Sequence, residues 1–191
     1  MFARYIRPSL SLLFVMTLLL GIAYPLAMTG LAKAVFPSQA AGSLIHRGTL
    51  LVGSSLIGQS FADPKYFWGR PSATAPQPYN GLGSSGSNLG PLNPALLERV
   101  AAQVRLFRDA DPGNTNPVPV DLVTASASGL DPEISPAAAE YQAPRIARLR
   151  NIPLPTLRAL IARHGTPALF DALGEARVNV LELNLALDSL R

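Results

Sequence analysis

The chain has 191 residues, 48% of them hydrophobic, with 16 basic and 12 acidic side chains and no cysteine. The lack of cysteine excludes disulfides, thiolate metal sites and cysteine nucleophiles. The basic excess does not indicate nucleic-acid binding, because Arg4, Arg7 and Lys33 flank one apolar run and the remainder has 13 basic against 12 acidic side chains. The arginines of the C-terminal half are predicted to lie on solvated helix faces: Arg145, Arg148, Arg150, Arg158 and Arg163.

An uncharged run over residues 8–32 predicts a membrane anchor. About 20 apolar helical residues cross a hydrocarbon core of roughly 30 Å, so a transmembrane helix is predicted over residues 8–34. Positively charged flanks stay cytoplasmic, which places residues 1–7 inside and residues 35–191 outside the cytoplasm. A cleaved secretory signal, cut near Ala32-Lys33-Ala34, is the alternative, and it exports the same domain.

Small residues share one face of the predicted anchor. Ala23, Ala27, Gly30 and Ala34 follow one another at spacings of four, three and four, so another helix could approach this face closely. Pro25 interrupts the same stretch and is expected to kink it. If the anchor has a partner in the membrane, this is the predicted contact face, although small residues are also common in any membrane helix.

The exported part begins with short strands and a long loop. Gly48 lies between two apolar segments and predicts a hairpin over residues 42–53. The aromatic residues at 66–68 are expected in the core. Residues 71–94 are crowded with Gly, Ser, Pro and Asn and predict a loop.

Helices dominate the second half. An Asn93-Pro94 start signal precedes apolar residues at helical spacing to Phe107. Residues 120–124 predict a strand, and Ser135-Pro136 begins a helix to Arg150 that Pro144 is expected to kink or split. Further helices are predicted from Pro155 and from Thr166-Pro167. A capping box that begins at Asn179 favours a last helix, although alternating leucines from Leu181 to Leu187 leave a strand as the alternative. The predicted class is α+β: one transmembrane helix followed by one extracytoplasmic mixed α/β domain.

Common catalytic signatures fail on their context. Gly81-Leu-Gly-Ser-Ser-Gly86 has the letters of a dinucleotide fingerprint, but prolines surround it where a strand and a helix are needed. No phosphate-binding loop and no Asp-Lys-Thr-Gly phosphorylation run are present. His164 precedes Gly165 and fits a helix end. A hydrolase triad of Ser126 or Ser128 with His46 and Asp121 lacks the Gly-x-Ser-x-Gly turn.

Residues 121–131 place small hydroxyl residues between Asp121 and Asp131. Two interpretations stay open. Asx and hydroxyl turns leading into the helix at Ser135 explain the pattern without a ligand. Alternatively, the carboxylate and hydroxyl oxygens offer a surface to a monovalent cation or a partner protein.

Several blocks of sequence together resemble one family. The blocks are Gly42-Ser-Leu-Ile45, Gly53-Ser-Ser-Leu-Ile-Gly-Gln59, Tyr66-Phe-Trp-Gly-Arg-Pro-Ser-Ala73, residues 121–131 and residues 178–188. With these blocks the chain resembles the C-subunit family of the Kdp potassium-transporting ATPase, over the anchor and nearly the whole exported domain.

The resemblance implies a non-catalytic accessory subunit in a bacterial inner membrane. Its implied partners are a channel-like potassium-binding subunit and a P-type subunit that hydrolyses ATP, whose ATP affinity the C subunit raises. ATP and potassium are then used by the complex, and no cofactor or metal is expected on this chain. Candidate partner or ion contacts are Asn80, Asn88, Asp121, Ser126, Ser128 and Asp131. The alternative is a tethered or secreted extracytoplasmic domain that binds or hydrolyses a ligand unrelated to transport.

Overall fold

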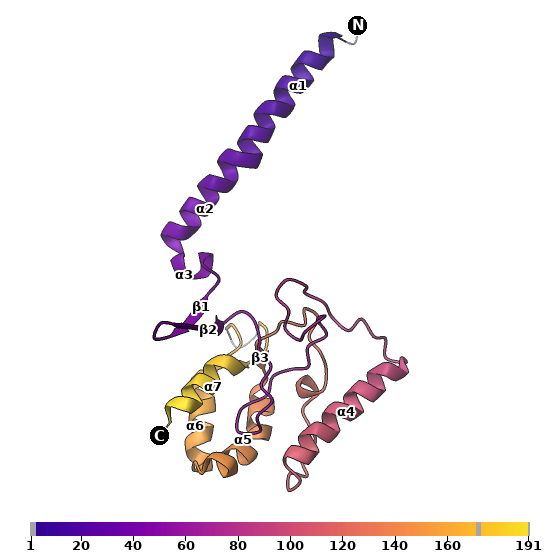
Figure 1. Ribbon diagram of the computed structural model, residues 1–191, viewed down its shortest axis with the longest axis vertical. Helices are drawn as coiled ribbons and strands as arrows, with labels where there is room; N and C mark the ends of the chain where they lie inside the picture. The colour runs from indigo at the N-terminus through magenta and orange to yellow at the C-terminus, as the bar shows by residue number, and fades with distance from the viewer. Residues whose placement is uncertain (1–2, 171–172, 191) are drawn as a thin grey trace. The chain divides into compact units, whose positions relative to one another are not determined.

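The computed structural model describes residues 3–170 and 173–190. The chain forms two compact units, Met1–Leu44 and Ile45–Arg191, and each is described by itself. The first is helical and the second contains both helices and short strands (Figure 1). The α+β class predicted from the sequence is therefore confirmed.

One nearly continuous helical stretch makes up the first unit. It contains α1 (Ala3–Leu18), the π-helix η1 (Leu19–Ala23) and α2 (Tyr24–Val35), and the short α3 (Pro37–Ala40) follows. Within the described residues, Arg4–Val35 is the single helix long and apolar enough to cross a membrane. The helix continues through Pro25 with a π turn before it, because proline lacks an N–H and its ring crowds the carbonyl of Gly21.

The predicted hairpin is confirmed as β1 (Leu44–Arg47) and β2 (Leu50–Ser54). Gly48 lies between the strands with φ of 64°, a left-handed conformation that glycine adopts without a steric penalty. Gln59 Nε2 donates to Val52 O at 2.8 Å and ties the second strand to the chain that follows it.

Three helices and a small sheet form the body of the second unit. The helices are α5 (Pro136–Arg150), α6 (Leu154–His164) and α7 (Val180–Ser189), and α6 packs against both α5 and α7 (Figure 1). The antiparallel sheet has the order β3 (Glu133–Ile134), β5 (Arg177–Asn179), β4 (Gly165–Thr166). The predicted caps are confirmed, since the side chains of Ser135 and Asn179 accept from the third backbone N–H beyond each.

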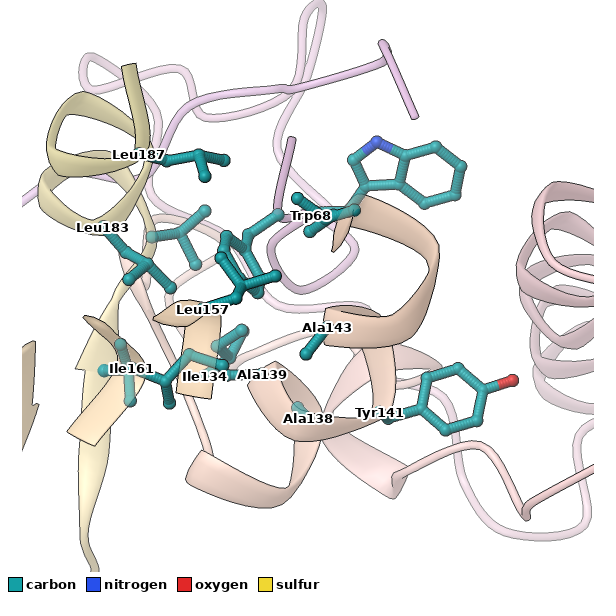
Figure 2. Close-up of a cluster of buried hydrophobic side chains, with 14 of the residues drawn as sticks. Trp68, Ile134, Ala138, Ala139, Tyr141, Ala143, Leu157, Ile161, Leu183 and Leu187 are labelled. Carbon is teal, nitrogen blue, oxygen red and sulfur yellow. The ribbon is translucent and has the colours of Figure 1, made fainter. Parts of the chain in front are cut away.

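The core lies among these helices and receives the predicted aromatic residues. Phe67 is fully buried and Trp68 is 7% exposed, whereas Tyr66 is partly buried. Trp68 belongs to one buried cluster with apolar side chains of α5, α6 and α7, and Figure 2 shows members of this cluster. Two buried amides hold this aromatic segment by its backbone. Asn184 bonds both the N–H and the carbonyl of Phe67, and Gln142 does the same for Trp68.

The long helix α4 (Pro94–Ala110) begins at the predicted cap, where Asn93 Oδ1 accepts from Ala95 N at 3.0 Å. Phe107 is the one buried residue of α4, whereas Leu96, Val100 and Val104 of its apolar face are half-buried. The Phe107 ring lies 5.3 Å from that of Trp68 and 6.1 Å from that of Tyr141. The C-terminal end of α4 is therefore the end packed into the core.

Two predicted elements are wrong. Residues 120–124 are not a strand: η2 (Val120–Leu122) is a 3₁₀ turn, and Thr124 Oγ1 donates back to Val120 O at 2.7 Å. This local bond competes with strand pairing. The helix predicted from Thr166-Pro167 is absent among the described residues, because Gly165 and Thr166 pair with β5. An N-cap residue is itself extended, so the start signal does not distinguish a helix from a short strand.

Two further expectations need correction in α5. Pro144 does not split the helix, because it lies on an exposed side where water can hydrate the carbonyl that lost its partner. Arg145 is not on a solvated face. It is 2% exposed, and its guanidinium carbon lies 4.1 Å from the centre of the Trp68 ring.

Candidate functional site

Two irregular segments meet where most of the nominated polar residues lie. Residues 70–86 of the long loop contact residues 125–131, and we call this contact the loop junction. Ser85 N donates to Ser128 O at 2.9 Å, and Ser84 Oγ donates to the same oxygen at 3.0 Å. Ser72 Oγ donates to Gly129 O at 2.7 Å. Hydrogen bonds between distant parts of the chain thus shape this surface.

Side-chain hydroxyls also fold the long loop on itself. Ser72 Oγ accepts from Tyr79 N at 2.9 Å, and Thr74 Oγ1 accepts from Asn80 N at 3.0 Å. The Asn80 amide in turn donates to Ala75 O at 2.8 Å. The loop predicted over residues 71–94 is confirmed up to Asn93, and within it side-chain hydrogen bonds take the place of a regular backbone ladder.

Gly129 determines how closely the two segments approach. Its φ is +66°, and a Cβ there would lie 2.5 Å from Ser85 O and 2.8 Å from Thr74 Cγ2. Both the backbone conformation and the space therefore require glycine. This requirement makes Gly129 the tightest point of the loop junction.

An ion pair and a tyrosine border the loop junction. Arg70 Nη1 lies 3.0 Å from Asp131 Oδ2, with both side chains about three-quarters buried. The Tyr79 hydroxyl donates to Arg70 O at 2.5 Å. Burial, and secondarily the Asp131 carboxylate, raise the pKa of Tyr79 to about 12, against an opposing effect of Arg70. Tyr79 is therefore a neutral hydrogen-bond donor at physiological pH.

Asp121, Asp131 and Glu133 near the loop junction each have a partner. A cleft of about 380 Å³ is lined by Arg70, Asp121, Asp131, Glu133 and Arg177, among others. Asp121 Oδ2 accepts from Ser135 N at 2.7 Å, and Glu133 pairs with Arg177 at 2.9 Å. In the described part of the chain, no group of three His, Asp or Glu side chains is arranged to hold a metal ion. Ser126, Ser128 and Asp131 each accept from a backbone N–H two or three residues further on, as the turn interpretation of residues 121–131 predicts, and the ion or partner interpretation stays a prediction.

The structure brings together only part of the nominated set. Asn80, Ser126, Ser128 and Asp131 lie at the loop junction, where Ser126 and Ser128 accept from the N–H groups of residues 129 and 130. Asp121 lies in η2, next to the junction rather than in it. Asn88 is exposed further along the loop, with φ of 51°.

The anchor residues Ala23, Ala27, Gly30 and Ala34 are exposed in the first unit. A Cβ added at Gly30 would meet nothing within 4 Å. The space beside this residue is therefore open to a neighbouring helix, and its role stays a prediction.

Sequence reasoning missed a buried arginine site. Arg145 Nη2 donates to Tyr66 O at 3.1 Å and to Gln142 Oε1 at 2.9 Å. Burial lowers the pKa of Arg145 to about 10, because removing the guanidinium from water penalises its charged form. The i, i+3 spacing of Gln142 and Arg145 on one helix was a usable signal, but it did not reveal that Trp68 covers them.

The glycine run and the serines of the candidate enzymatic motifs lie in irregular parts of the chain. Gly81 to Gly86 lie in irregular chain, and Gly86 is pressed against Ala127, where a Cβ would lie 2.7 Å from its carbonyl oxygen. Ser126 Oγ lies 3.5 Å from Ser128 Oγ, whereas His46 is exposed on the β1–β2 hairpin. The described contacts of these serines do not assemble a hydrolase triad.

Together these features define a class: in the part of the chain that the structure describes, one helix able to span a membrane is followed by an α+β domain in which several charged side chains form ion pairs. Comparison with known proteins resolves the class further. The chain belongs to the KdpC family, described as the c chain of the K⁺-transporting ATPase, which matches residues 6–189. The family resemblance found in the sequence is thereby confirmed.

The relatives match over nearly their whole length. The chain is 66% identical over 184 residues to the potassium-transporting ATPase KdpC subunit of Variovorax paradoxus, which covers 96% of this chain and 95% of that protein. It is 64% identical over 186 residues to the KdpC subunit of Polaromonas naphthalenivorans, covering 97% and 95%. It is 60% identical over 188 residues to that of Methylococcus capsulatus, covering 98% and 99%.

Proposed function

We propose that this chain is a non-catalytic accessory subunit of an ATP-driven potassium uptake complex in the bacterial inner membrane. Its partners are a channel-like subunit that binds potassium and a P-type subunit that hydrolyses ATP. The observation that carries the proposal is the family match, which spans the anchor and the domain together. Membership of this family also argues against an independent exported domain unrelated to transport.

The polar chemistry of the described domain supports a binding role rather than a reaction. The carboxylates of Asp121, Asp131 and Glu133 are paired with arginines or a backbone N–H group, so these three are not available as general bases without breaking those contacts. The sequence also lacks the Asp-Lys-Thr-Gly run on which P-type pumps are phosphorylated. In this proposal the chain contributes surfaces, and its partners carry out transport and hydrolysis.

The proposed rise in ATP affinity has to be indirect. Arg4 and Arg7 precede the span and only Lys33 follows it closely, which favours a cytoplasmic N-terminus and an extracytoplasmic domain. ATP is on the other side of the membrane from that domain. The effect is then a coupling free energy transmitted through the anchor and the partner subunits, typically about 1–3 kcal/mol or about 5–150-fold in affinity.

An affinity purification from potassium-starved bacterial membranes tests the proposal. The tagged full-length chain should bring down a pump subunit and a channel-like subunit, and the eluate should hydrolyse ATP when potassium is added. The chain purified alone should not hydrolyse ATP. Adding it to the other subunits should lower the ATP concentration needed for half-maximal activity. Recovery of the chain alone under conditions that preserve such complexes would contradict the accessory role.

A further inference from the structure

The β1–β2 hairpin carries an unusual number of exposed leucines. Leu44 is 47% exposed, Leu50 68% and Leu51 53%, and Leu56 just beyond the second strand is 62% exposed. Scattered exposed leucines are ordinary on a soluble surface, but here four lie within thirteen residues of the chain, and Leu50 and Leu51 expose apolar side chains on both faces of the hairpin. A specific environment other than water is therefore indicated for this hairpin.

The second unit holds the hairpin by its base. Asn179 Nδ2 donates to Ser55 O at 2.8 Å, and a Cβ at Gly53 would lie 2.9 Å from Leu181 Cδ2. These contacts join the hairpin to the start of α7. The leucines are thus presented by a fixed element and not by a free tail.

The length of the chain confines the hairpin to the neighbourhood of the membrane. The apolar helix ends at Val35 and β1 begins at Leu44, so nine residue steps separate them. Even fully extended, nine residues reach only about 30 Å, and α3 (Pro37–Ala40) shortens this reach. The headgroup layer lies at the end of the span, within this reach.

The charge distribution fits a lipid surface. No Asp or Glu occurs before Asp63, whereas residues 63–191 contain 12 basic and 12 acidic side chains. The chain's whole positive excess therefore belongs to the anchor and the hairpin. Arg47, in β1, forms an ion pair with Asp188 at 3.7 Å, but its side chain is 62% exposed and its guanidinium is therefore accessible to lipid phosphate.

We infer that the β1–β2 hairpin lies in the interfacial layer of the bilayer, with Leu50 and Leu51 at the boundary between headgroups and acyl chains and Arg47 beside lipid phosphates. Apolar side chains with neighbouring cations are the combination that holds peripheral elements at this depth. The inference requires only that Arg4–Val35 spans a bilayer. It holds for either orientation of the chain and does not depend on the potassium pump.

Because the chain has no cysteine, single cysteines can report the position of the hairpin. Leu50→Cys and Leu51→Cys are labelled with a polarity-sensitive fluorophore in the full-length chain. The matched control is Leu97→Cys on α4, where the wild-type side chain is 65% exposed. Each protein is reconstituted, alone and in its complex, into phosphatidylglycerol-containing vesicles that include lipids spin-labelled near the headgroup.

Lipid quenching at positions 50 and 51 is expected to exceed that at position 97 by at least about twofold, in the isolated chain and in the complex. Equal quenching at all three positions overturns the inference. A second result would also overturn it: a fluorophore at position 50 or 51 that is shielded from water only in the complex and is not quenched by the spin-labelled lipid. In that case a partner protein covers the hairpin. Unchanged Trp68 fluorescence checks that the exposed substitutions leave the core folded.

Discussion

Gly129→Ala tests whether the loop junction stabilises the domain. Alanine in the left-handed region costs about 1–2 kcal/mol. Its Cβ would also lie 2.5 Å from Ser85 O, a backbone atom, so the two segments have to separate. Separation loses the Ser85 to Ser128 hydrogen bond, worth about 1 kcal/mol. The expected loss of unfolding free energy is about 3 kcal/mol, or roughly a 10 °C fall in the melting temperature of a domain this size.

The assay is urea unfolding of the detergent-solubilised full-length chain, followed by Trp68 fluorescence. Gly90→Ala is the matched control, because Gly90 lies in the same long loop and a Cβ there meets nothing within 4 Å. The control should stay within about 0.5 kcal/mol of the wild type. If Gly129→Ala also stays within that range, the loop junction does not constrain the fold as described.

Three further predictions concern the core, the tyrosine and the anchor. Gln142→Leu should lower the unfolding free energy by about 2–4 kcal/mol, because it leaves the buried N–H and carbonyl of Trp68 without partners; urea unfolding measures the loss. The unfolded state releases the tyrosine proton near pH 10 and the folded state near pH 12, so the contribution of Tyr79 to stability falls over that interval. Tyr79→Phe should therefore lose less stability from pH 10 to 12 than wild type, and should lack the last step of the ultraviolet tyrosinate titration. Ala27→Leu with Gly30→Leu should loosen co-purification with membrane partners, because larger side chains hold helices apart.

Each of these predictions has its own control. Gln142→Glu keeps an acceptor for the Trp68 N–H and for Arg145. At neutral pH it should therefore lower the unfolding free energy less than Gln142→Leu does. An equal loss in both variants would point to lost packing instead of lost hydrogen bonds. Tyr66→Phe should leave the last titration step of Tyr79 in place. Met28→Leu changes the anchor away from the nominated small residues and should leave assembly intact.

Local signals in the sequence were sufficient for much of the fold. The side chains of Asn93, Ser135 and Asn179 each cap the predicted helix, because a cap depends on residues two or three positions away. The turn at Gly48 is local in the same sense. The wrong helix at Thr166 shows the limit of such signals, since pairing with β5 more than ten residues later determines its structure.

The candidate site was only partly predictable because its contacts are distant in sequence. Ser72 meets Gly129 and Ser85 meets Ser128 across more than forty residues, and neither pair follows a spacing rule. The burial of Arg145 depends likewise on Trp68, which is 77 positions away in the chain. Composition suggested a solvated arginine, whereas packing of an aromatic ring against the guanidinium made a buried one possible.

The pairing of charges in the domain bears on how an accessory subunit could act. Asp131 with Arg70, Glu133 with Arg177 and the Asp121 carboxylate with a backbone N–H leave few groups for a tightly held ligand. Such pairs do, however, fix the shape of irregular loops that would otherwise be mobile. A domain of this kind is suited to present a defined surface to neighbouring subunits. That surface can shift a partner's conformational equilibrium only if the domain binds two states of the partner with unequal affinity. Comparing binding of the Gly129→Ala chain to resting and ATP-loaded pump would measure that inequality, and equal weakening of both would place the loop junction in assembly alone.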